Sequence, residues 1–109
     1  MWGYEVKLDT NGSRPEVVED LIKASLVDYI AMDIKAPLNK YSLLCGVFVD
    51  TDAITQSIHT IHSSGISHHF RTTVYPPMLS EKDLEDILLL VPETSEHRMQ
   101  DFRDVGDKG

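Results

Sequence analysis

The sequence is short of the residues on which several classes of protein depend. Cys45 is its only cysteine, so no internal disulfide can form, and a metal cluster held by several thiolates cannot be built from this chain alone. A lone cysteine fits a reducing compartment, and we expect a cytoplasmic protein. Basic residues are also few, with 10 Lys and Arg against 18 Asp and Glu. The net charge of −8 argues against a nucleic-acid partner, which needs clustered positive charge.

Long apolar runs are missing as well. No stretch approaches the roughly 20 apolar residues of a membrane-spanning helix, so we expect no membrane partner. The first residues, MWGYE, have neither the basic nor the apolar region of a signal peptide. Gly-rich phosphate loops, nucleophile elbows and serine triad signatures do not occur. What remains is the ordinary composition of a globular protein, and we expect one domain over residues 1–103 with a polar, frayed tail at 104–109.

Strand and helix patterns alternate along the chain and predict an α/β fold. We expect strands at residues 5–8, 27–34, 68–75 and 96–102, helices at 13–25, 50–63 and 80–91, and an irregular or partly helical stretch at 38–49. Capping boxes at Ser13–x–x–Glu16 and Ser80–x–x–Asp83 mark two helix starts. The βαβαβαβ order predicts a parallel sheet with right-handed crossovers, either a small open sheet or a segment of a (β/α) barrel. The nearly apolar second strand suggests burial on both faces.

Two of the predicted strands deliver an aspartate near their C-terminal ends. Asp9 and Asp33 would then lie close together at the sheet edge where parallel α/β proteins bind ligands. Two neighbouring carboxylates need a cation, a proton or hydroxyl donors between them. Lys35 would project from the same face as Asp33, which suits a ligand with hydroxyl and carboxylate groups. The alternative is that Asp9 makes an Asx turn with Asn11 and that Lys35 is merely solvated.

Other polar side chains carry weaker signals. Arg71 on the third strand is either an anchor for an anionic ligand group or one half of a structural ion pair. Cys45 has no neighbouring base in the sequence, so we expect a small packed side chain. His59 and His62 have the spacing of metal ligands on a helix, but no third ligand follows at a diagnostic interval. We therefore expect the histidines to be solvated, with the adjacent pair pointing to opposite faces of its strand. These are His59, His62, His68, His69 and His97.

Three stretches, in this order and spacing, resemble the radical S-adenosylmethionine activating enzymes of glycyl-radical enzymes. They are residues 8–12 (LDTNG), 28–37 (DYIAMDIKAP) and 70–76 (FRTTVYP). Residues 99–102 (MQDF) are similar to the last strand of that family. The likeness runs from about residue 3 to residue 102. It looks closest to the activating proteins of anaerobic ribonucleoside-triphosphate reductases, with the activating enzymes of pyruvate formate-lyase as a sister group.

The resemblance implies the fold and the chemistry of a whole activase. The family folds as a partial (β/α) barrel, in which a CxxxCxxC loop after the first strand holds a 4Fe-4S cluster and a Gly-Gly-Glu motif binds the methionyl amine. This chain has neither motif, so it is expected to correspond to the C-terminal half of the barrel. In the complete oxidoreductase, the reduced cluster cleaves S-adenosylmethionine to methionine and a 5′-deoxyadenosyl radical, which abstracts hydrogen from a glycine of the partner enzyme.

The resemblance also assigns residues to a partial cosubstrate site. Asp9, Thr10 and Asp33, with the backbone near Ala31, would line a site for a monovalent cation beside the cosubstrate carboxylate. Asp33 and Lys35 would lie near its ribose and methionyl ends, and Arg71 would lie on the cosubstrate side. No residue of this chain is expected to act as a general acid or base, and none is expected to ligate iron.

Three hypotheses follow for the function. The first is that the chain is the C-terminal portion of an activase of an anaerobic ribonucleotide reductase or similar glycyl-radical enzyme, inactive alone and completed by a half that carries CxxxCxxC. The second is a non-catalytic module that pairs with a partner chain through the open edge of its first strand. The third is a small α/β domain whose similarity to the family is only architectural.

Overall fold

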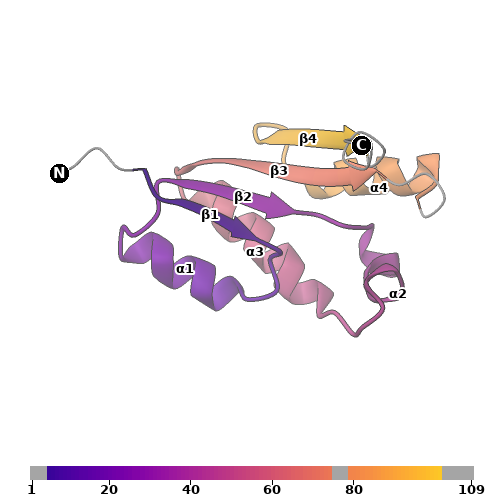
Figure 1. The fold of residues 1–109 in the computed structure, drawn as a ribbon, viewed down its shortest axis with the longest axis horizontal. Helices are drawn as coiled ribbons and strands as arrows, with labels where there is room; N and C mark the ends of the chain where they lie inside the picture. Colours follow the sequence, from indigo (N-terminus) through magenta and orange to yellow (C-terminus); the bar gives the residue numbers. More distant parts are fainter. Residues whose placement is uncertain (1–4, 75–78, 102–109) are drawn as a thin grey trace, which may run out of the picture.

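The computed structural model describes residues 5–74 and 79–101, and these residues form a single sheet with helices packed against it (Figure 1). The elements are β1 (Lys7–Thr10), α1 (Pro15–Lys23), β2 (Tyr29–Asp33), the 3₁₀ turn η1 (Leu38–Lys40), α2 (Tyr41–Cys45), α3 (Thr51–Ser63), β3 (Ser67–Val74), α4 (Glu81–Leu90) and β4 (Glu96–Asp101). The expected ends of two strands at residues 75 and 102, and the expected tail at 104–109, lie outside the described residues.

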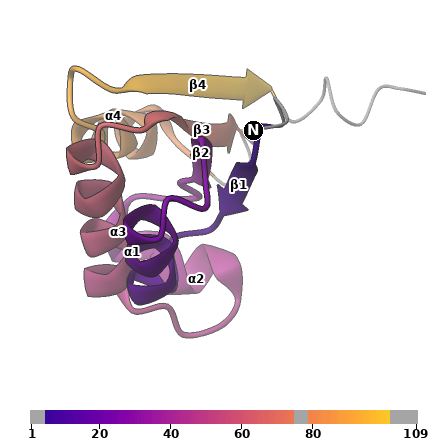
Figure 2. The same cartoon turned by 90° about the vertical axis from the view of Figure 1, so that its left-hand side faces the viewer.

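The strands pair in the order β1-β2-β3-β4, and every pair is parallel. This confirms the predicted parallel βαβαβαβ arrangement. Because sequential strands joined by right-handed crossovers place their helices on the same face, the helices gather on one side of the sheet (Figure 2). This one-sided arrangement is that of a segment of a (β/α) barrel, in which the helix-free face of the sheet lines the interior.

The two faces of the sheet differ in chemistry. Ile30, Met32 and Phe70 point toward the helices and are fully buried, where they meet the apolar faces of α1, α3 and α4. The residues between them point to the open face, and these include Asp33 and Arg71, which face each other across β2 and β3. The expectation that β2 is covered on both faces holds only in part, because the open-face residue Ala31 is buried while Tyr29 and Asp33 are partly exposed. The sequence of β2 is mostly apolar because its helix-facing residues are large and aliphatic.

Two helix starts were expected to carry capping boxes, and one does. Ser80 Oγ accepts from Asp83 N at 3.1 Å, and the Asp83 carboxylate accepts from Ser80 N at 3.0 Å. The box expected at Ser13 does not form, because the N-cap residue is Arg14 and its Nε binds the Glu16 carboxylate at 2.8 Å. Pro15 therefore opens α1 without a side-chain cap.

The first strand lies two residues later than expected, at Lys7–Thr10, and the partly helical stretch resolves into η1 and α2. Pairing with β2 explains the shift, since Leu8 pairs with Ile30 and Thr10 with Met32. Asp9 consequently lies within β1, on the open face of the sheet.

Candidate functional site

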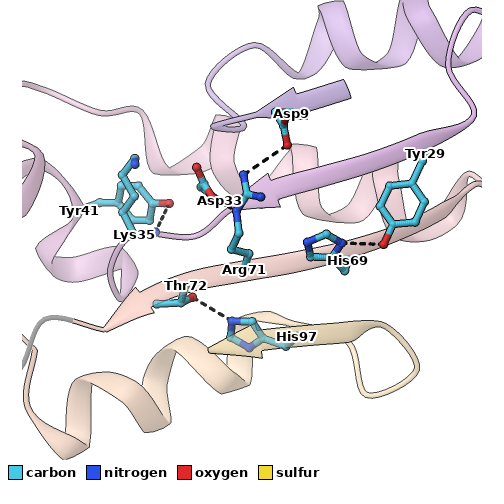
Figure 3. A network of polar contacts seen from close by, with 9 residues as sticks. All are labelled: Asp9, Tyr29, Asp33, Lys35, Tyr41, His69, Arg71, Thr72 and His97. Atoms are coloured by element: carbon cyan, nitrogen blue, oxygen red, sulfur yellow. Dashed lines mark hydrogen bonds and ion pairs between the residues drawn. The ribbon is translucent and has the colours of Figure 1, made fainter. Parts of the chain in front are cut away.

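Asp9, Asp33 and Arg71 meet on the open face of the sheet, toward the C-terminal ends of three adjacent strands (Figure 3). Arg71 Nε donates to Asp33 Oδ1 at 2.6 Å, and Arg71 Nη2 donates to Asp9 Oδ1 at 3.3 Å. The hydrogen bond to Asp33 raises the pKa of Arg71, so the guanidinium is fully charged. The cation that the two carboxylates require is thus supplied by Arg71, in the structural ion pair that the sequence left as an alternative.

The turn after β1 is held by hydrogen bonds on both sides. Thr10 Oγ1 accepts from Gly12 N at 3.0 Å, and Asn11 Oδ1 accepts from Ser13 N at 3.0 Å. The Asx turn is therefore made by Asn11 and not by Asp9, whose carboxylate lies on the open face and accepts from Arg71. From α3, the fully buried Ser57 donates its hydroxyl to the Gly12 carbonyl at 2.8 Å. These contacts fix the segment that carries Asp9.

Lys35 lies just beyond the end of β2 and is exposed. Its neighbours Ile34 and Ala36 are fully buried, so the alternation of the strand continues and places Lys35 on the same side as Asp33. The Lys35 backbone N–H donates to the hydroxyl of Tyr41 at 2.9 Å. Burial of Tyr41 raises its pKa to about 12, so the phenol stays neutral and able to hold this backbone. The backbone around Lys35 is therefore held in place, whereas the Lys35 side chain is exposed.

A second polar pair on the open face was not predicted from the sequence. The Tyr29 hydroxyl lies 2.6 Å from His69 Nδ1 (Figure 3). The Arg71 and Arg98 side chains line the same cavity as these two residues. Burial, followed by the charges of Arg98 and Arg71, lowers the pKa of His69, and the tautomer of the ring decides which partner donates in its hydrogen bond with Tyr29. These partners are 40 residues apart, and only the strand register brings them together.

The expectation of solvated histidines is right for His59 and wrong for the others. His69 is buried, His62 and His68 both contact Ser95 Oγ, at 2.9 and 2.8 Å, and His97 contacts a threonine hydroxyl on β3 at 2.9 Å. His68 and His69 do point to opposite faces of β3, as predicted. Within residues 5–74 and 79–101, no group of three or more His, Cys, Asp or Glu side chains is arranged to hold a metal ion.

Cys45 ends α2, is partly buried and packs against the hydrophobic core, as expected for a small apolar side chain. A 4Fe-4S cluster is held by several cysteine thiolates, and this sequence has one. The residues of this chain therefore do not fit such a cluster. They fit a polar organic ligand better, because two carboxylates and a guanidinium meet at one sheet edge and the exposed Lys35 follows the strand end there. None of the helices in the part of the chain that is described combines the length and the apolarity needed to cross a bilayer.

Known proteins are similar to this chain over most of its length. Residues 2–91 match the profile of the radical SAM superfamily. A curated relative from Methanocaldococcus jannaschii, named "Putative glycyl-radical enzyme activating enzyme", is 36% identical over 104 residues. The match covers 92% of this chain and 43% of the relative, so the chain spans less than half of the relative's length. No solved structure matches the chain.

Proposed function

This chain belongs to the radical SAM superfamily, and we propose that it forms the cosubstrate-binding part of an enzyme that activates a glycyl-radical enzyme. The observation that carries the proposal is its 36% identity, over 92% of its length, to a relative named as an activating enzyme of that kind. The family match overturns the hypothesis of a domain with only architectural similarity. We further propose an anaerobic ribonucleotide reductase as the partner, because the stretches at residues 8–12, 28–37 and 70–76 resemble the activating proteins of such reductases.

The open face supplies groups that suit S-adenosylmethionine. We assign Lys35 and Arg71 to the cosubstrate carboxylate, because ammonium and guanidinium groups form charge-assisted hydrogen bonds with it. Asp33 would accept hydrogen bonds from the ribose hydroxyls, and the carboxylates of Asp9 and Asp33 would hold a monovalent cation. The Thr10 side chain, which the resemblance adds to this set, faces the helices, because Thr10 pairs with the buried Met32. When bound, the cosubstrate supplies the 5′-deoxyadenosyl group from which the radical forms. The residues of this chain bind and orient it, and none of them has to move a proton.

The cluster ligands must come from outside this sequence. We propose that a polypeptide segment with CxxxCxxC, on a complementary N-terminal half, provides them beside β1. The outer edge of β1 has no strand partner within the described residues, and Asp9 on that strand is 74% exposed. A parallel strand added there would extend the barrel and cover this edge. We expect the assembled protein to act in the reducing cytoplasm, where cluster thiolates persist.

The proposal is tested by assembling the enzyme. The chain is co-expressed with a polypeptide that carries CxxxCxxC and Gly-Gly-Glu, the cluster is reconstituted anaerobically, and 5′-deoxyadenosine is measured after addition of reductant and S-adenosylmethionine. We expect product from the complex and none from the chain alone. Asp33→Asn should raise the KM for S-adenosylmethionine about tenfold by removing a charged acceptor. Asp20→Asn, on the exposed side of α1, is the matched control and should not change it.

A cluster-bearing complex that makes no 5′-deoxyadenosine would contradict the proposal. Such a result would favour the second candidate, a non-catalytic module that docks a partner chain on the outer edge of β1. The observation that favours this candidate is that edge itself, which is exposed in the described residues and offers unpaired backbone groups.

A further inference from the structure

A serine and two histidines meet at the N-terminal ends of β3 and β4, opposite the sheet edge that carries Asp33. Ser95, in the turn before β4, has its Oγ 2.8 Å from Nε2 of His68 on β3 and 2.9 Å from Nδ1 of His62 on α3. The other ring nitrogen of His68, Nδ1, lies 2.6 Å from the carbonyl oxygen of Ile66. The three side chains come from separate parts of the chain, so only the fold brings them together.

The hydrogen-bond partners determine where the protons of this cluster lie when the His68 ring is neutral. The Ile66 carbonyl can only accept, so Nδ1 of His68 carries the ring proton and Nε2 presents its lone pair. Ser95 therefore donates its hydroxyl proton to Nε2 of His68. Because a serine hydroxyl has one proton, His62 Nδ1 must be the donor in the second contact with Ser95 Oγ.

This proton arrangement is that of an activated serine nucleophile. In such a site a histidine acts as general base on the hydroxyl, and a third group holds the imidazole in the required tautomer. The Ile66 carbonyl fills that third role for His68. The contact of 2.8 Å between Ser95 and His68 lies within the range of roughly 2.6–3.2 Å that proton transfer needs. A hydrogen bond from His62 to Oγ favours the negative charge that develops there as the proton leaves.

A cavity of about 440 Å³ lies beside this cluster. Ser95 and His68 both line it, and Ser95 is partly exposed, so a small molecule can approach the serine from solvent. The volume is in the range of small-molecule sites, which is roughly 300–1,000 Å³. The fully buried Ser57, by contrast, donates its hydroxyl to a backbone carbonyl and has no histidine as its hydrogen-bond partner.

We propose that Ser95 is a nucleophile, with His68 as its general base, that takes the acyl group of a small activated ester bound in this cavity. Ser95 Oγ attacks the acyl carbon while its proton passes to Nε2 of His68. The bond from Oγ to carbon forms, the bond from carbon to the alkoxide or phenoxide breaks, and His68 returns the proton to this leaving group. Water then hydrolyses the acyl-serine to a carboxylic acid and restores the hydroxyl, so no electron is gained or lost.

The reaction of p-nitrophenyl acetate with the 109-residue chain tests the proposal. Release of p-nitrophenol is followed by absorbance, and the acetylated peptide is located by mass spectrometry. We expect the acetyl group on Ser95. Ser95→Ala and His68→Gln should each slow the release about tenfold or more, because one removes the nucleophile and the other its base.

The matched controls are Ser67→Ala and His59→Gln. Ser67 lines the same cavity from the start of β3, and His59 is an exposed histidine of α3, the helix that carries His62. Neither change should alter the rate of release. An equal loss in Ser67→Ala and Ser95→Ala, or acetylation confined to lysine and histidine side chains, would overturn the proposal.

One further measurement uses the unmodified chain, in case the variants at Ser95 and His68 do not fold. Phenylmethylsulfonyl fluoride sulfonylates activated serines with release of fluoride, and it should label Ser95 in preference to the other serines. Labelling spread evenly over the exposed serines, or absent from Ser95, would show that the two histidines only tie the turn before β4 to α3 and β3. Neither measurement involves S-adenosylmethionine, so this proposal and the proposed function fail separately.

Discussion

Replacing Gly12 with alanine should destabilise the fold more than the same change at other glycines of similar backbone shape. Gly12 has φ of +76°, a region that L side chains rarely adopt, and a Cβ there would lie 2.2 Å from Met32 Cε. Met32 is fully buried in the core, so its side chain has little room to move away. The change therefore combines backbone strain with overpacking at the turn that carries Asp9.

The structure separates these two contributions. The left-handed backbone costs an alanine about 1–2 kcal/mol. Forcing a methyl group into a packed core adds about 1–3 kcal/mol. Gly46 and Gly65 have φ of +77° and +79°, but a Cβ added at either position would have no atom within 4 Å, so alanine there incurs only the backbone cost. We expect Gly12→Ala to lose about 1–3 kcal/mol more than Gly46→Ala or Gly65→Ala.

Urea unfolding followed by circular dichroism measures the difference. All three variants should keep the wild-type m-value, so that the midpoints report stability alone. Equal losses of stability in Gly12→Ala and the two controls would show that the Met32 side chain moves aside without destabilising the fold. The turn would then not be packed tightly against the core.

Three other predictions concern the groups around the site. Ser57→Ala should destabilise the chain by about 1–3 kcal/mol in the same urea assay, because it leaves the Gly12 carbonyl buried without its donor. The pKa of His69 lies below its ordinary value of 6.5, so the unfolded chain binds a proton at this residue more readily than the folded chain does. The contribution of His69 to stability is therefore complete above pH 6.5 and is lost as the pH falls from there. His69→Gln should flatten this pH dependence of the urea midpoint. Ultraviolet titration should show a phenol ionising with a pKa of about 12, and Tyr41→Phe should abolish that step; a titration unchanged in Tyr41→Phe would refute the assignment.

Local patterns predicted the fold well because each pattern reports a local interaction. Alternation of strand and helix signals was enough for the parallel order, and the box at Ser80 forms as written. The box at Ser13 fails because Arg14 binds Glu16 and becomes the N-cap residue. A four-residue motif does not determine which residue becomes the N-cap of the helix.

The site could be predicted only in part, because its contacts depend on strand register. Topology alone brings Asp9 and Asp33 to neighbouring strands, but the bridge through Arg71 requires that Asp33 face Arg71 across β2 and β3. The same register pairs Ala31 with His69, so that His69 lies diagonally across from Tyr29, and makes a buried residue of a histidine that composition suggests is solvated. Register follows from the packing of the whole sheet, which a local pattern does not contain.

Glycyl-radical formation tests the proposed function most directly. The chain, assembled with a CxxxCxxC-bearing polypeptide and reconstituted anaerobically, is incubated with S-adenosylmethionine, reductant and the anaerobic ribonucleotide reductase of the same source, and electron paramagnetic resonance spectra are recorded. We predict a glycyl-radical doublet that requires this chain and weakens in Asp33→Asn. A complex that cleaves S-adenosylmethionine yet produces no protein radical on the reductase would contradict the proposed partner, and a doublet of full intensity without this chain would contradict the function itself.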